Sequence, residues 1–185
     1  MLSDRDLKRA IQSKKVGFSP ALNSDQIGPA SIDLRLAPEF KFFRSDRFSL
    51  IDTKKPFPHD FMDSVTLKDD TPFIIHPGSF VLASTVEYVK LSAEVAMKVE
   101  GKSSLARMGI LVHTAGFVDP GFEGTLTLEI SNQSNLAVAL YPNMYICQVA
   151  IYRLSSPAQR PYNKRKKSLY LKQKGPTEVK TKNLF

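Results

Sequence analysis

The sequence predicts an all-β fold, a sandwich or barrel of many short strands with one short helix near its N-terminus. In residues 124–131 (GTLTLEIS), every second residue is Leu or Ile and those between are polar, as in a strand with one face in a core. Pro, Gly, Asn and Asp separate several such short runs along the chain. Only one segment has a clear helical pattern. Together these observations favour an all-β architecture.

The expected elements follow in chain order. Ser3 with Asp6 makes a capping pattern for a helix that carries apolar residues on one side and ends near Lys15. Residues 103–108 are expected to form a short second helix, and residues 44–70, rich in Asp, Lys and Pro, are expected to be a long surface excursion. The segments that predict strands are 31–36, 72–76, 79–85, 88–92, 125–131, 136–140 and 144–153.

Composition predicts one soluble domain over residues 1–185. The chain is 42% hydrophobic, and no apolar run approaches the roughly 18 residues needed to cross a membrane. The start, MLSDRDLKRA, lacks the pattern of a secretory signal, so a cytoplasmic protein is expected. Cys147 is the only cysteine, which suits a reducing compartment and cannot supply the C-x-x-C pair of zinc-dependent nucleobase deaminases. The three histidines also lack ligand spacing, so neither zinc nor another bound metal is expected.

Charge is concentrated in the C-terminal segment. Residues 160–185 hold nine Lys or Arg and one acid, whereas residues 1–159 hold 17 of each sign. Such a basic segment could bind nucleic acid, could be a solvated tail, or could fold over a polyphosphate.

The stretch from Gly101 to Asn132 gathers hydroxyls, an arginine, an aspartate and a glutamate among small turn residues. Taken singly, Glu129 could be a solvated residue on the polar face of a strand, and Asp119 a turn former before Pro-Gly. The letters GKSS do not make a phosphate-binding loop, because Ala96 stands where that motif requires Gly.

In its motifs and their order, the chain resembles the dCTP deaminase branch of the dUTPase-like superfamily. The matching segments are LSDRDLKRAI, IGPASIDLRL, GKSSLAR, TAGFVDPGFEG, TLEISN, YPNMYICQVAIYRLSSPAQRPY and QKGPT. The resemblance implies a distorted jelly-roll-like β-barrel and a homotrimer with sites shared between subunits. It also implies that residues 160–185 form a flexible segment that closes over the triphosphate of dCTP, with Mg²⁺ carried on the substrate phosphates.

The resemblance also assigns roles. Glu129 would act on a water that attacks the cytosine ring, Ser103 and the carbonyl of Ala115 would position this water, and Arg107 would stabilise the tetrahedral species. Asp119 matches an aspartate that contacts the sugar 3′-hydroxyl, and whose dUTPase equivalent activates the water that attacks the α-phosphate. The residues expected around the substrate are Lys102, Ser103, Ser104, Leu105, Ala106, Arg107, Asp119, Thr127, Leu128, Glu129, Gln148, Tyr162 and Gln173.

The resemblance leaves open which nucleotide is the final product and how the activity is regulated. Some family members release dUTP, and bifunctional members continue to dUMP and pyrophosphate, for thymidylate synthesis. The wording TAGFVDPGF and a loop 112–117 one residue shorter than in many members favour the bifunctional branch. Two enzymatic alternatives are a monofunctional deaminase that releases dUTP and a dUTPase that binds and cleaves dUTP without deaminating dCTP. A third alternative, a non-enzymatic nucleic-acid-binding or regulatory protein, is disfavoured. dTTP is a candidate feedback inhibitor.

A second departure from the family pattern is Leu169, where a lysine usually meets the phosphates. Either Lys172 or Lys174 could take its place, or the change could be harmless loop drift.

Overall fold

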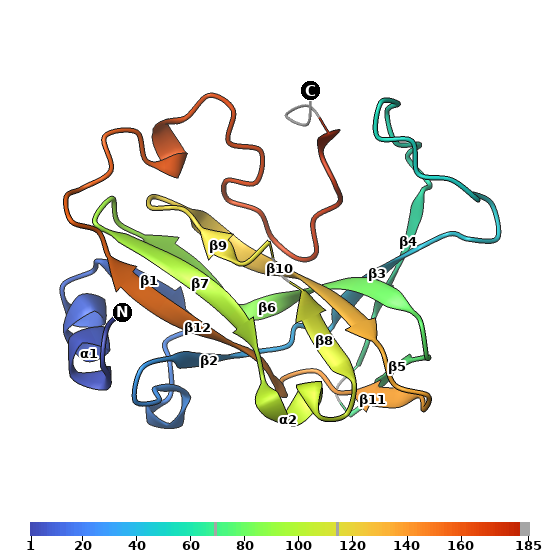
Figure 1. Ribbon diagram of the computed structural model, residues 1–185, viewed down its shortest axis with the longest axis horizontal. Helices are drawn as coiled ribbons and strands as arrows, with labels where there is room; N and C mark the ends of the chain where they lie inside the picture. Colours follow the sequence, from blue (N-terminus) through green and yellow to red (C-terminus); the bar gives the residue numbers. More distant parts are fainter. Residues whose placement is uncertain (69, 114, 182–185) are drawn as a thin grey trace.

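The computed structural model describes residues 1–68, 70–113 and 115–181, and the strands of this part form three β-sheets (Figure 1). In the largest sheet the long strand β6 (Phe80–Leu91) pairs with β1, β3 and β10. This sheet has the order β4-β3-β6-β10-β8, with β1 also on β6. Its other strands are β1 (Val16–Ser19), β3 (Glu39–Phe43), β4 (Met62–Thr66), β8 (Ile110–His113) and β10 (Glu123–Asn132).

The two remaining sheets are smaller. One has the order β2-β12-β7-β9, with β2 at Ile32–Arg35, β7 at Val95–Gly101, β9 at Phe117–Val118 and β12 at Tyr145–Arg153. The other pairs β5 (Phe73–Ile75) with β11 (Val138–Leu140). The all-β prediction is therefore confirmed, but within the described residues the sheets remain separate and do not close into a barrel.

One hydrophobic core lies between the sheets. Phe40 and Ile130 of the six-stranded sheet and Leu34 and Met97 of the four-stranded sheet are fully buried within a single cluster. Cys147 on β12 belongs to the same core, and this burial raises the pKa of its thiol. Since the thiolate is the reactive form, Cys147 is a packing residue rather than a nucleophile.

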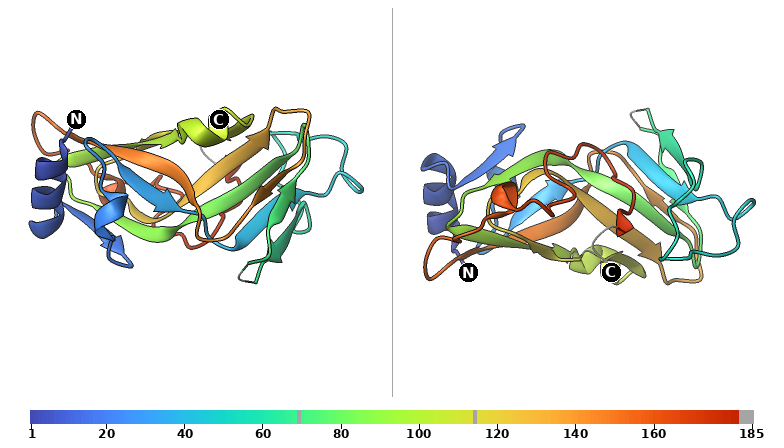
Figure 2. Two further views of the ribbon diagram at one scale, coloured as in Figure 1. Left: turned by 90° about the horizontal axis from the view of Figure 1, so that it is seen from below. Right: turned by 90° about the horizontal axis from the view of Figure 1, so that it is seen from above.

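The N-terminal helix forms as predicted, as α1 (Asp4–Gln12), and Figure 2 shows it at one end of the molecule. Leu7 and Ala10 are buried on its inner face. The side chain of Ser3, however, makes no capping hydrogen bond. Acidic residues in the first turn complement the positive end of the helix dipole instead. The other short helices are η1 (Ser24–Gln26), α2 (Ser103–Ala106) and η2 (Tyr162–Lys164).

The predicted surface excursion at 44–70 contains a strand that the sequence did not indicate. Strand β4 pairs with β3, and most of its side chains are at least partly exposed because it lies at a sheet edge. Phe61 anchors the excursion by contacting the rings of Phe43, Phe48 and Phe57, whose centroids lie 4.9–5.5 Å away. Aromatic packing therefore holds a polar segment against the fold.

Candidate functional site

A cavity of about 530 Å³ lies between β10 and the C-terminal segment. Figure 1 shows this orange-to-red segment crossing over β9 and β10, and Gly124 and Gln173 form a parallel bridge where the segment meets β10. The cavity is lined by Phe43, Met62, Phe80, Leu82, Val99, Ala115, Gly116, Phe117, Val118, Asp119, Phe122, Leu126, Thr127, Glu129, Tyr162, Tyr170, Gln173, Thr177 and Val179. Most of these side chains are apolar, so the few polar groups determine what can bind.

Glu129 is the acidic group at the β10 end of this cavity. Leu128 and Ile130, its neighbours on the strand, are fully buried in the core, so alternation turns Glu129 to the opposite face. That face is enclosed rather than solvated: the Oε2 atom is buried and has no hydrogen-bond partner among the described residues. Burial raises the pKa of the carboxyl, with a smaller opposing effect from a hydrogen bond to its own backbone. A carboxyl in this state is suited to exchanging protons with a ligand.

Gln173 also lines the cavity and has a second buried, unpaired polar atom. Its Nε2 donates to the carbonyl oxygen of Thr125 at 2.7 Å and to Oγ1 of Thr127 at 3.3 Å. These two acceptors fix the orientation of the amide, and Oε1 is left buried without a partner among the described residues. Oγ1 of Thr127 also accepts from the backbone N–H of Thr177 at 3.2 Å. The predicted residues Thr127, Glu129 and Gln173 therefore meet in one place.

Asp119 and Tyr162 lie together at another part of the cavity wall. The backbone N–H of Tyr162 donates to the carbonyl of Pro120 at 2.7 Å, and its ring meets that of Phe122 edge-on at 5.6 Å. Gly121 permits this approach: it has φ +80°, and an added Cβ would lie 2.7 Å from Cβ of Pro161. The turn chemistry of VDPGF thus places Asp119 against the start of the C-terminal segment.

Ala115 lines the cavity on an exposed loop, and its carbonyl oxygen accepts from the backbone N–H of Phe117 at 2.5 Å. A carbonyl oxygen has a second lone pair, so this contact leaves capacity to hold a water molecule. The loop 112–117 includes Thr114, which lies outside the described residues.

The remaining predicted residues form a second group around α2 and outside this cavity. Ser103, Ser104, Ala106 and Arg107 are exposed, whereas Leu105 is in the core. Because the side chains of Leu105 and Leu128 are buried in the core, only their backbones could meet a ligand. Within one chain, the predicted site is therefore divided between the cavity and α2.

Lys102 and Gln148 connect α2 to the four-stranded sheet. Nζ of Lys102 lies 2.5 Å from Oδ2 of Asp33 and 5.6 Å from the ring centroid of Tyr145. Nε2 of Gln148 donates to the carbonyl of Gly101 at 3.4 Å.

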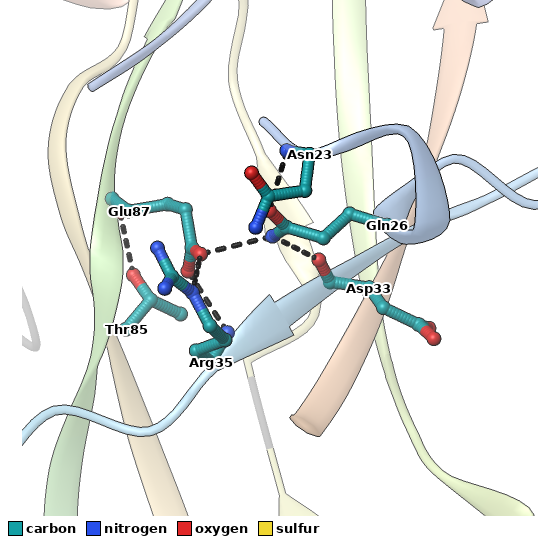
Figure 3. A network of polar contacts seen from close by, with 6 residues as sticks. All are labelled: Asn23, Gln26, Asp33, Arg35, Thr85 and Glu87. Atoms are coloured by element: carbon teal, nitrogen blue, oxygen red, sulfur yellow. Dashed lines mark hydrogen bonds and ion pairs between the residues drawn. The ribbon is translucent and has the colours of Figure 1, made fainter. Parts of the chain in front are cut away.

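Asp33, the partner of Lys102, also belongs to a polar network that the sequence did not indicate (Figure 3). The fully buried carboxylate of Glu87 accepts from Nε of Arg35 at 2.7 Å and from Nε2 of Gln26 at 2.9 Å. Gln26 in turn donates to the backbone carbonyl of Asp33. A single acid among the apolar residues of β6 was the only sequence signal for Glu87.

The described part of the chain has neither a metal-binding cluster nor a membrane-spanning helix. No group of three His, Cys, Asp or Glu side chains there could hold a metal ion. No helix there has the length and apolar character required to cross a membrane.

Comparison with known proteins identifies the family. The sequence model of the family described as "dCTP deaminase-like" matches residues 1–154. A protein of Dictyoglomus turgidum named "dCTP deaminase, dUMP-forming" is 46% identical over 182 residues, covering 97% of this chain and 94% of its own. A Methanosphaera stadtmanae protein of the same name is 44% identical and covers 100% of this chain and 95% of its own.

The crystal structure of 2′-deoxycytidine 5′-triphosphate deaminase from Agrobacterium tumefaciens shares the fold, with a TM-score of 0.63 and 24% identity over 83% of this chain. The match spans 48% of that longer chain. The family model and the near-full-length relatives point to the same family that the sequence motifs indicated, and the observed fold is consistent with it. The chain belongs to the dCTP deaminase-like family.

Proposed function

We propose that this protein is a zinc-independent hydrolase that converts dCTP to dUMP, ammonia and pyrophosphate. The main supporting observation is Glu129, which lines the cavity, is partly buried, and has a raised carboxyl pKa and one buried, unpaired oxygen. Support also comes from relatives named as dUMP-forming dCTP deaminases that match nearly the whole chain.

Deamination requires a water oxygen to bond to C4 of the cytosine while the C4–N bond breaks and ammonia leaves. In this proposal Glu129 takes a proton from the attacking water and returns one to the departing nitrogen. A positioned acid–base group contributes about 10²–10⁴-fold to such reactions.

The second step breaks the bond between the α-phosphorus and its bridging oxygen, so that pyrophosphate leaves. We assign Asp119 to this step as the group that binds the sugar 3′-hydroxyl and activates the attacking water. Its place in the cavity wall beside Tyr162 supports the assignment. Mg²⁺ would enter with the substrate, because phosphate oxygens bind this ion readily.

We further propose that the complete site forms between copies of the chain in a homotrimer. Ser103, at the start of α2, and Arg107, directly after it, do not line the cavity of their own chain. Both are exposed, so a neighbouring copy could use them. There, Ser103 would position the water together with Ala115, and Arg107 would stabilise the tetrahedral species. The whole chain is proposed to act as one unit, with residues 160–185 closing over the triphosphate.

Product analysis tests the proposal. Protein incubated with dCTP and Mg²⁺ should release ammonia and pyrophosphate together, with dUMP resolved by anion-exchange chromatography. Asp119→Asn should still release ammonia at saturating dCTP but accumulate dUTP, because the proposed proton transfers of deamination use Glu129 and not this carboxylate. Accumulation of dUTP by the native protein would show a deaminase without the second step, and hydrolysis of dUTP without ammonia release would contradict deamination altogether.

A further inference from the structure

A second cavity, of about 310 Å³, adjoins the first. The two cavities share Asp119, Tyr162 and Tyr170 in their walls. Glu129 lines only the first cavity, whereas basic residues line only the second. A ligand that reaches from Glu129 past Asp119 therefore arrives at a basic compartment, whose cations are Arg165, Lys167 and Lys180.

Lys180 is fixed in this compartment by three contacts. Its Nζ donates to the carbonyl oxygen of Leu169 at 2.7 Å and lies 5.4 Å from the ring centroid of Tyr170. Its backbone N–H donates to the hydroxyl of Tyr170 at 3.0 Å. An ammonium has three N–H donors, so the bond to Leu169 leaves two for a ligand.

The same contacts tie Lys180 to the proposed site. The backbone N–H of Tyr170 donates to the hydroxyl of Tyr162 at 3.0 Å, and Tyr162 packs against Asp119 through the turn at Pro120. Arg165 differs, because its Nη1 already lies 3.4 Å from Oδ2 of Asp119.

We infer that Lys180 binds an outer phosphate (β or γ) of the nucleotide triphosphate, in the position left by Leu169. This inference rests on the proposed function and assigns a residue of its substrate site. Leu169 cannot offer a cation from its side chain, but its backbone carbonyl holds the ammonium of Lys180 at that point of the chain. The two lysines nearest in sequence, Lys172 and Lys174, line neither cavity.

The chemistry gives a selective readout. A lysine that contacts the outer phosphates stabilises a triphosphate but has no partner in a monophosphate. Loss of its charge should therefore weaken binding of dCTP and leave binding of dCMP unchanged. A lysine with a purely structural role in the C-terminal segment would affect both ligands alike.

The experiment measures dissociation constants for dCTP and dCMP by calorimetry, in a Glu129→Gln background that prevents turnover. Lys180→Gln is expected to weaken dCTP binding about tenfold, as for loss of one charge-assisted hydrogen bond, and to change dCMP binding less than about twofold. Lys180→Arg should restore most of the dCTP affinity. Lys8→Gln on the distant helix α1 removes the same net charge and should change neither constant.

Unchanged dCTP affinity in Lys180→Gln, an equal loss for both nucleotides, or a loss in Lys174→Gln instead would overturn the inference. Deamination of dCTP by the protein with native Glu129 is measured alongside. If that activity is present, such a result removes only the role of Lys180. If the native protein neither deaminates nor binds dCTP, both the proposed function and this inference are wrong.

Discussion

Replacement of Glu129 by Gln should give a protein that is more stable and yet inactive. The side chain is partly buried, its Oε2 is buried without a partner among the described residues, and burial raises the pKa of the carboxyl. At neutral pH the folded protein therefore bears the cost of an enclosed, unpaired carboxylate. Gln has nearly the same shape and no charge, so the substitution removes this cost without leaving a hole.

The amide of Gln stays unpaired in the same place, so the gain comes from loss of the charge alone. Because an unpaired buried charge costs more than an unpaired neutral polar group, we expect a gain of about 1 kcal/mol. For a chain of 150–250 residues this corresponds to a rise in Tm of roughly 2–4 °C. The sign of the pH dependence follows from the raised pKa. The stability that Glu129 contributes is fully present below the pKa of the unfolded chain and is lost as pH rises through the higher pKa of the folded state. Thermal unfolding of the two proteins should therefore differ at neutral pH and converge in acid.

Activity should move in the opposite direction. Ammonia release from dCTP is expected to fall about 10²–10⁴-fold, because an amide cannot accept the proton of the attacking water. Calorimetry should still detect dCTP binding by the variant. The matched control is Glu100→Gln: Glu100 is half-exposed and pairs with Lys98 at the surface, so its substitution should leave both Tm and turnover nearly unchanged.

Two results would refute this reasoning. Normal ammonia release by Glu129→Gln would remove the carboxyl from the reaction. A Tm difference of the same size at acidic and neutral pH would show that ionisation of Glu129 is not its cause.

Two further substitutions test the framework of the site, each against a control in the same chain. Gly121→Ala should destabilise the protein by about 2 kcal/mol and raise the KM for dCTP, because the strained φ combines with a contact of 2.7 Å to the C-terminal segment. Gly78 has a similar φ, but an added Cβ there would meet no atom within 4 Å. Gly78→Ala should therefore destabilise the protein less and leave the KM for dCTP unchanged. Glu87→Ala should lower Tm by roughly 10 °C, since it leaves the guanidinium of Arg35 without its buried partner. The exposed Glu100→Ala should have little effect, and equal shifts in the two would contradict the importance of burial.

Local pattern predicted the strand that carries Glu129 but missed others. Alternation over 125–131 matches β10, because one face of that strand meets the core. Strand β4 lies within the segment expected to be a surface excursion, since an edge strand with exposed side chains has little apolar signal. The predicted runs 79–85 and 88–92 are one continuous strand, β6, because its pairing with β10 shifts register at a bulge instead of ending.

Long-range contacts explain what the sequence could not show about the site. The resemblance singled out Glu129, but its enclosure depends on Gln173 and Thr177, which lie more than 40 residues further along the chain. The same resemblance placed Ser103 and Arg107 with Glu129, whereas a single chain keeps them apart. Periodicity cannot reveal that division, because it depends on which distant segments the fold brings together.

The C-terminal segment connects the two proposed roles of the site through different residues. Desolvation is the main cause of the raised pKa of Glu129, and uncharged residues of the segment, including Gln173 and Val179, form part of the wall that excludes water from it. Gln173 and Thr177 attach the segment by hydrogen bonds to β10, the strand that carries Glu129. The basic residue Lys180 instead faces the second cavity. Opening of the segment would therefore lower the pKa of Glu129 and withdraw the proposed phosphate contact at the same time. In the proposed mechanism, proton transfer and triphosphate binding thus depend on the same position of the segment.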